Sequence, residues 1–267
     1  MEILIDFFES VPDGTRTGVL VVGLVFFWIL EGALPRFDLG YDKPRHAALN
    51  LLLAVLVITV GLFLGLLVVK ACDVSTAHRF GLLYLVDLPL WLHVVLGVLL
   101  LDLIGAYLIH FIQHKVGWMW KFHLVHHSDT AVDVTTSLRQ HPGETVFRIT
   151  FTALAVLVAG IPIGILVLYQ SLSILFAQVT HANLGLPAVI DRPLSWIFVS
   201  PNMHKVHHHY RQPFTDTNYG NIFSIWDRLF GTYAPASAVP DLKYGVDSLA
   251  DGGEKPGLRR LLATPFR

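Results

Sequence analysis

The sequence of 267 residues contains little of what soluble enzymes and nucleic-acid-binding proteins use. Its single cysteine, Cys72, excludes an internal disulfide and any metal cluster held by several thiolates of one chain. Only 15% of the residues are charged and 54% are hydrophobic, whereas about 25% charged residues is usual in soluble domains. The formal net charge is −1, and no basic run with interleaved aromatic residues suggests a nucleic-acid partner. The composition therefore indicates a membrane protein.

Long apolar segments predict an all-α, polytopic membrane helical bundle, with residues 1–267 as one integral-membrane domain. About 20 apolar residues cross the hydrocarbon core, and three segments are long enough to do so: residues 17–34, 47–69 and 90–108. Residues 147–179 form a fourth apolar block, in which Gly160 and Pro162 predict a hairpin of two helices. This block is short for two full crossings, so a re-entrant or tilted hairpin is an open alternative. Residues 240–267, rich in Gly, Pro and charge, are expected to form a surface tail.

Eight of the fourteen histidines lie in three clusters, near the ends of these apolar segments. The clusters are His110 with His114, His123 with His126 and His127, and His204 with His207 and His208. In a chain of this composition an H-x-x-H-H run is expected by chance about 0.04 times, yet it occurs twice. On a helix, residues three or four positions apart lie on the same face. Eight imidazoles suit two metal ions, and imidazole binds iron, copper, zinc and nickel alike.

All three clusters are expected on one side of the membrane. The first two follow the third apolar segment, and a hairpin returns the chain to the side that it left. Between the hairpin and the third cluster, no apolar segment is long enough to cross. Of the 19 lysine and arginine residues, we assign only Arg16, Lys70 and Arg79 to the opposite side. The positive-inside rule then predicts a histidine-rich helical cap on the cytoplasmic face, with the bundle made of three spans plus the hairpin.

Asp102 is a carboxylate inside the third apolar segment, where a charge is costly and usually functional. It precedes His110 by eight residues, about two turns of helix, and points about 80° away from it. We therefore expect Asp102 to orient a ligand imidazole through its N–H rather than to bind metal. Partnership with a polar group on a neighbouring helix is an equally good alternative.

Seven short motifs follow one another over residues 101–233. The first combines Asp102, Tyr107, His110 and His114. The others are W-K-F-H-L-V-H-H-S at 120–128, R-Q-H-P-G-E at 139–144, H-A-N at 181–183, S-P-N-M-H-K-V-H-H at 200–208, T-N-Y-G at 217–220 and W-D-R-L-F-G-T at 226–232. Together they resemble the fatty acid hydroxylase/sterol desaturase superfamily, whose members are membrane-bound non-haem diiron oxygenases. Phe111 stands where that family has an arginine, and residues 101–233 would form the catalytic region.

The resemblance implies iron as the metal and adds His141 and His181 to the ligands. The implied set is His110, His114, His123, His126, His127, His141, His181, His204, His207 and His208. Two non-haem iron ions and dioxygen would hydroxylate or desaturate a C–H position of a membrane lipid. Since no G-x-G-x-x-G lies in a βαβ context, electrons are expected from a separate ferredoxin, or from a b-type cytochrome with its reductase. The sequence leaves open the lipid, the choice between hydroxylation and desaturation, the donor and the oligomeric state.

Two other classes of protein place histidines in a membrane chain. A polyhistidine metal transporter or membrane metal-binding protein is the main alternative, but transporters bind ions near the middle of the bilayer. The histidine clusters here follow the apolar segments instead. A membrane haem protein needs one histidine on each of two facing spans, which His93 alone does not supply.

Overall fold

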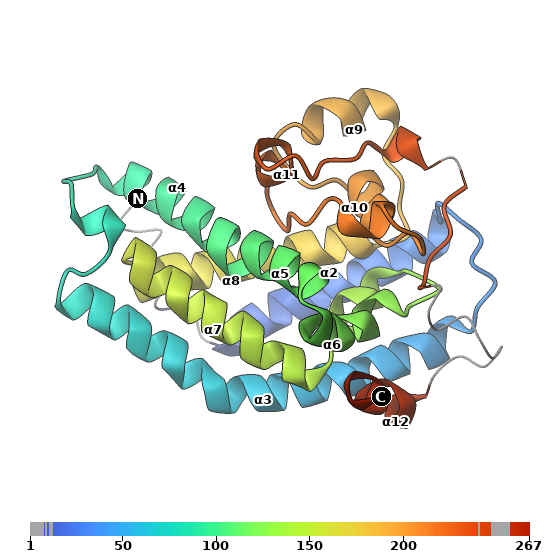
Figure 1. The fold of residues 1–267 in the computed structure, drawn as a ribbon, viewed down its shortest axis with the longest axis horizontal. Coiled ribbons are helices and arrows are strands. Elements are labelled where there is room, and N and C mark those ends of the chain that lie inside the picture. The colour runs from blue at the N-terminus through green and yellow to red at the C-terminus, as the bar shows by residue number, and fades with distance from the viewer. Residues whose placement is uncertain (1–7, 9, 11–12, 240, 247–256) are drawn as a thin grey trace.

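Helices form the framework of the protein, as the all-α prediction required. The computed structural model describes residues 8, 10, 13–239, 241–246 and 257–267, and these ranges contain no β-strand. The long helices run side by side along the molecule (Figure 1). They are α2 (Asp13–Ala33), α3 (Lys43–Ala77), α4 (Leu90–Asp102), α7 (Pro142–Ala159) and α8 (Ile163–His181).

In the described part of the chain, four helical segments are long and apolar enough to cross a membrane: Lys43–Tyr84, Leu90–Lys115, Pro142–Ala159 and Ile163–His181. The two helices of the hairpin contain 18 and 19 residues, or about 27–29 Å at 1.5 Å per residue, close to the hydrocarbon thickness of about 30 Å. Both are therefore long enough to cross fully, because each continues beyond the apolar block. The predicted first span forms an apolar helix, Thr17–Ala33 within α2, but this helix is shorter than the four candidate spans and is not among them.

The tip of the hairpin depends on three residues that suit tight turns. Gly160 ends α7 with φ of 84°, in the left-handed region that favours glycine. Pro162 precedes α8 and fixes an extended backbone at the start of that helix. Gly81, from the loop after α3, packs so closely on Gly160 that a Cβ there would overlap the Gly160 backbone. The loop after α3 therefore packs directly on the tip of the hairpin.

The opposite end of the bundle carries the histidines. The helix that starts as α4 continues through a π-helical segment, Leu103–Leu108, into α5 (Ile109–Lys115). Next in the chain is α6 (Gly117–His127), and α10 (Pro201–His207) approaches from the C-terminal half. The short helices α9 (Ala188–Leu194) and α11 (Ile225–Leu229) lie to one side of the long helices (Figure 1). The hairpin starts and ends at this end, so the histidine clusters before and after it share one end of the bundle, as expected from the hairpin.

The expectation of a surface tail at residues 240–267 is wrong for the last eleven residues. Residues 247–256 of this tail lie outside the described part of the chain. Helix α12 (Leu258–Ala263) packs against α3, and its Leu261 is buried with Leu53 and Val125. The apolar residues of α12 recur three and four positions apart, which buries one face. This pattern is too short to stand out among the surrounding Gly, Pro and charged residues.

Candidate metal centre

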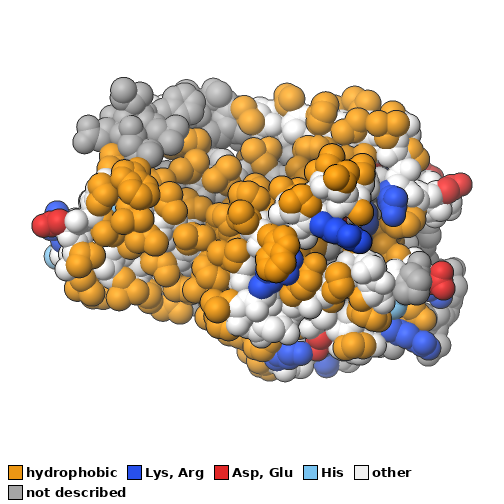
Figure 2. Space-filling model, turned by 90° about the horizontal axis from the view of Figure 1, so that it is seen from above, with side chains coloured by type: hydrophobic (Ala, Val, Ile, Leu, Met, Phe, Trp, Pro, Cys, Tyr) orange, Lys and Arg blue, Asp and Glu red, His pale blue; other side chains and the backbone are white. Residues whose placement is uncertain are grey.

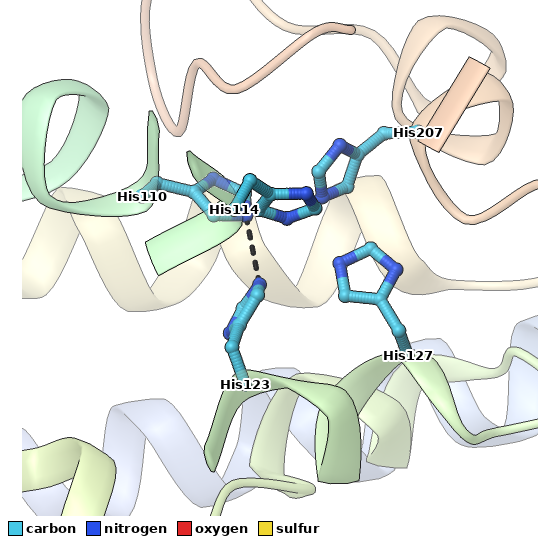
Figure 3. A group of neighbouring side chains, drawn as sticks. All are labelled: His110, His114, His123, His127 and His207. Atoms are coloured by element: carbon cyan, nitrogen blue, oxygen red, sulfur yellow. Dashed lines mark hydrogen bonds between the residues drawn. The ribbon is translucent and has the colours of Figure 1, made fainter. Parts of the chain in front are cut away.

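Nine of the ten histidines in the predicted ligand set gather in two compact, buried groups. The five-histidine group consists of His110, His114, His123, His127 and His207, and the four-histidine group of His126, His181, His204 and His208. Within each group every residue offers a ring nitrogen, and these nitrogens lie within 4.8 Å of one another. Figure 3 shows the imidazoles of the five-histidine group converging from α5, α6 and α10. Residues separated by almost a hundred positions in the chain therefore form one buried site.

Each H-x-x-H-H run contributes to both groups. In α6, His123 and His127 are four residues apart and face the five-histidine group, whereas His126 faces the other. The run that begins in α10 is used the opposite way, because His204 and His208 join the four-histidine group and His207 the five-histidine group. Residues four positions apart differ by only about 40° around a helix, at about 100° per residue. The members of one run are therefore shared between two groups rather than directed at one ion.

Six of the nine imidazoles donate a hydrogen bond outward through Nδ1. Four acceptors are backbone carbonyl oxygens: Tyr219 for His110 at 2.8 Å, Arg139 for His126 at 3.2 Å, Ala177 for His181 at 2.7 Å and Thr217 for His207 at 2.7 Å. Two acceptors are carboxylates: Glu144 for His123 at 2.9 Å and Asp216 for His114 at 3.2 Å. A carbonyl or carboxylate oxygen only accepts, so Nδ1 carries the proton and Nε2 keeps a free lone pair.

The inward nitrogens lie at distances that suit metal ligands. The Nε2 atoms of His110 and His123 are 3.0 Å apart, and the Nε2 of His181 lies 3.2 Å from that of His126. Both members of each pair donate outward, so their lone pairs face each other, and a cation between them relieves this repulsion. Two nitrogens about 2.1 Å from one ion and at right angles are about 3.0 Å apart. The Nε2 of His207 has no hydrogen-bond partner among the described residues. The donor set of each group therefore fits a metal ion.

Five imidazoles outside the spanning helices are held in the neutral form that binds metal. Burial lowers the pKa of His126, His127, His204, His207 and His208 well below the ordinary value of 6.5. Repulsion from neighbouring imidazoles lowers these pKa values further. A protonated imidazole cannot bind a cation, so this environment keeps the ligands available near neutral pH.

Asp102, which we expected to orient an imidazole, makes none of its hydrogen bonds to a histidine. Its carboxylate accepts from Trp226 Nε1 at 3.0 Å and from the backbone N–H of Phe223 at 3.2 Å. Tyr169 Oη and the Ile222 N–H donate more weakly, at 3.4 and 3.3 Å. These contacts match the alternative that we left open for Asp102, partnership with polar groups on neighbouring helices. The bonds fix the segment that follows Tyr219, so Asp102 can act on His110 only through the backbone.

His141 lies in neither group. It is the N-cap of α7, and its Nδ1 accepts a hydrogen bond from the Gly143 N–H at 2.9 Å. Its Nε2 donates to the carbonyl oxygen of Leu262 at 3.2 Å. Both ring nitrogens therefore bind backbone groups, and the structure separates His141 from the nine converging histidines.

The two carboxylates that hold imidazoles were not identified from the sequence. Glu144 is fully buried and binds Arg148 Nε at 2.7 Å as well as His123. An available signal was its position in the R-Q-H-P-G-E motif, in the first turn of the helix that His141 caps. Asp216 lies 102 residues from His114 in the chain. We find no local pattern around Asp216 that predicts this contact.

Comparison with known proteins agrees with the motifs. Residues 94–232, slightly more than half of the chain, match the family described as Fatty acid hydroxylase. An ornithine lipid hydroxylase of Rhizobium tropici is 29% identical over 178 residues, which is 67% of this chain and 51% of that protein. An alkylglycerol monooxygenase of Xenopus tropicalis is 32% identical over 243 residues, which is 85% of this chain and 49% of that protein. The chain thus spans about half the length of these relatives. No solved structure matches it.

Proposed function

Because this chain belongs to the fatty acid hydroxylase family, we propose that it is a membrane-bound oxidoreductase that hydroxylates a C–H position of a membrane lipid. The observation that carries the proposal is the convergence of nine buried imidazoles whose inward nitrogens face one another. The relatives support the reaction type, because they are named as a hydroxylase and as a monooxygenase. Hydroxylation is therefore favoured over desaturation, and an ornithine lipid or an alkylglycerol is the first substrate to test.

The proposed cofactor is a pair of non-haem iron ions, one in each histidine group. Neutral imidazoles suit iron, and the family is the reason for preferring iron to copper, zinc or nickel. When bound, such a pair would supply the activation of dioxygen for insertion into an unactivated C–H bond. The protein would hold the imidazoles in position through their Nδ1 hydrogen bonds, and burial of all nine would exclude water.

A separate electron donor and a cytoplasmic location complete the proposal. Reduction of dioxygen to one hydroxyl group and water requires two electrons beyond those of the C–H bond, so a ferredoxin or a b-type cytochrome with its reductase is proposed. The donor would meet the histidine end of the bundle, which we propose to be cytoplasmic. The charge distribution supports this cytoplasmic location, because we assign 16 of the 19 lysine and arginine residues to that side.

A metal transporter is the weaker alternative. Transporters bind their ions near the membrane midplane, between the spanning helices. Six of the nine histidines here lie outside the four candidate spans, and the other three are His110, His114 and His181. These three lie toward the histidine-bearing end of their spans. A site at one end of the bundle favours chemistry at the membrane surface.

The test is a lipid oxidation assay with purified protein in nanodiscs. The protein is loaded with ferrous iron and supplied with dioxygen, a reducing system and either an alkylglycerol, an ornithine lipid or a sterol. Mass spectrometry should detect a product that has gained one oxygen atom. A product that has only lost two hydrogen atoms would contradict hydroxylation. Metal uptake into sealed proteoliposomes without any lipid oxidation would favour the transporter, and His207→Ala serves as the inactive control.

A further inference from the structure

The short helices α9 and α11 carry an exposed apolar surface that the described residues leave uncovered. The cap patch consists of Val189, Ile190, Trp196, Ile197, Leu229 and Phe230, which are between 52% and 80% exposed. These residues belong to α9, to the turn after it, and to the end of α11. The apolar segment 194–199 is too short to cross a bilayer. It contributes no side chain to either histidine group. The patch therefore needs a different explanation.

The cap patch packs against a spanning helix through Phe230. The ring of Phe230 stacks on that of Tyr107, with 5.4 Å between centroids and 23° between planes. Tyr107 belongs to the span Leu90–Lys115 and lies one turn before His110. Leu108 beside it is 37% exposed. On the face that carries α4, α9 and α11, the surface over α4 is largely hydrophobic, and toward α9 and α11 Lys and Arg side chains lie among the hydrophobic ones (Figure 2). The patch therefore meets this span eight residues, about two helical turns, before its end at Lys115.

The polar groups around the patch are those typical of a lipid headgroup region. Trp196 is 63% exposed, and tryptophan is enriched where membranes meet water. The guanidinium of Arg228 lies 4.1 Å from the centroid of the Trp196 ring and donates to the Ser195 carbonyl oxygen at 2.8 Å. Arg192 is exposed on α9, beside one acid, Asp191. Arg192 and Arg228 outnumber the single acid, Asp191, beside apolar side chains. Such a surface suits the boundary where anionic lipid phosphates meet the acyl chains.

We infer that the cap patch is a membrane-embedded surface. In this arrangement α9 and α11 insert their apolar side chains into the phospholipid leaflet at which the histidine end of the spans lies, and Arg192 and Arg228 meet the lipid phosphates. Helix α9 lies between His181 and His204 in the chain. Contact with the leaflet therefore supports the segment that carries the third histidine cluster. This inference depends on the membrane location of the chain and not on the reaction that it catalyses.

The test measures how close the patch lies to lipid in phospholipid nanodiscs. In a Cys72→Ala background, which removes the natural thiol, Val189→Cys is labelled with an environment-sensitive fluorophore. Lipids with brominated acyl chains should remove most of its fluorescence, whereas aqueous iodide should have little effect. Lys243→Cys, at an exposed residue outside the patch, is the matched control. Its label should respond to iodide and not to brominated lipid.

Leu229→Cys provides a second, independent position, because Leu229 is on α11 and 70% exposed. Labels at both sites should be quenched by brominated lipid, and each variant should elute as a monodisperse protein with the metal content of its Cys72→Ala parent. Quenching by iodide at positions 189 and 229, equal to that at position 243, would overturn the inference. Protection from both quenchers would also overturn it, because another protein or a second copy of the chain would then cover the patch.

Discussion

The five-histidine and four-histidine groups are built from the same side chain but are held by different partners. In the five-histidine group two of the outward hydrogen bonds go to carboxylates, Glu144 and Asp216. In the four-histidine group the outward bonds of His126 and His181 go to backbone carbonyl oxygens. The Nδ1 atoms of His204 and His208 have no hydrogen-bond partner within the described ranges. Because a carboxylate partner raises the basicity of a ligand imidazole, we expect the five-histidine group to bind its metal more tightly.

Removal of one inward imidazole from each group should have the largest effect. The Nε2 of His181 lies 3.0 Å from that of His204 and 3.3 Å from that of His208, so His181→Ala should release the metal of the four-histidine group. His207→Ala leaves four imidazoles in its group and should weaken binding there. Both variants should lose lipid oxidation. Metal per chain, measured by mass spectrometry, checks this, and two bound metals in both variants would refute the metal assignment.

Glu144→Gln should have the next largest effect, because it removes the buried charge behind His123. Loss of such a partner typically lowers metal affinity by about 10–100-fold, and the affinity of the five-histidine group should fall more than that of the four-histidine group. Competition with a chelator measures the affinity of each group. Arg148→Gln is the matched control, since it leaves the bond between Glu144 and His123 in place. Equal losses in the two variants would show that the Glu144–Arg148 pair as a whole, rather than the bond from His123 to Glu144, supports binding.

Asp216→Asn should have a smaller effect at the same group. The Asp216 side chain is 19% exposed, its bond to His114 is longer at 3.2 Å, and an asparagine oxygen can still accept that bond. We expect affinity to fall by about tenfold at most. The chelator assay is the same, with Lys115→Gln as the control because Lys115 binds the other oxygen of Asp216. A larger loss than in Glu144→Gln would reverse the ranking of the two carboxylates.

His141→Asn should leave the metal content unchanged. Asparagine is a good N-cap and can accept the hydrogen bond from the Gly143 N–H that His141 now accepts. Both groups should keep their metals, and the thermal midpoint should change little. If one metal per chain is lost, the tenth ligand implied by the family motif is correct, and the backbone contacts of His141 are not its role in the loaded protein.

The fold could largely be predicted because its signals are local. Apolar length predicted the spanning helices, and the break at Gly160 and Pro162 predicted the hairpin and so the common end of the histidines. The partners of the imidazoles could not be predicted in this way. Asp102 attracted attention by its depth in a span, yet it fixes a backbone segment, whereas Asp216 reaches His114 only through the tertiary fold. Helical spacing alone also did not show that each H-x-x-H-H run divides between two groups.

That division has a consequence for how the protein would assemble. An ion in the five-histidine group would cross-link α5, α6 and α10, and an ion in the four-histidine group would cross-link α6 and α8 to the α10 segment. Helix α6 and the α10 segment would then be tied at two points, which prevents either from rotating about a single attachment. Each ion would preorganise three of the other ion's ligands, because α6 and the α10 segment carry three histidines of each group. Loading should therefore be cooperative, and loss of one ion should loosen its neighbour.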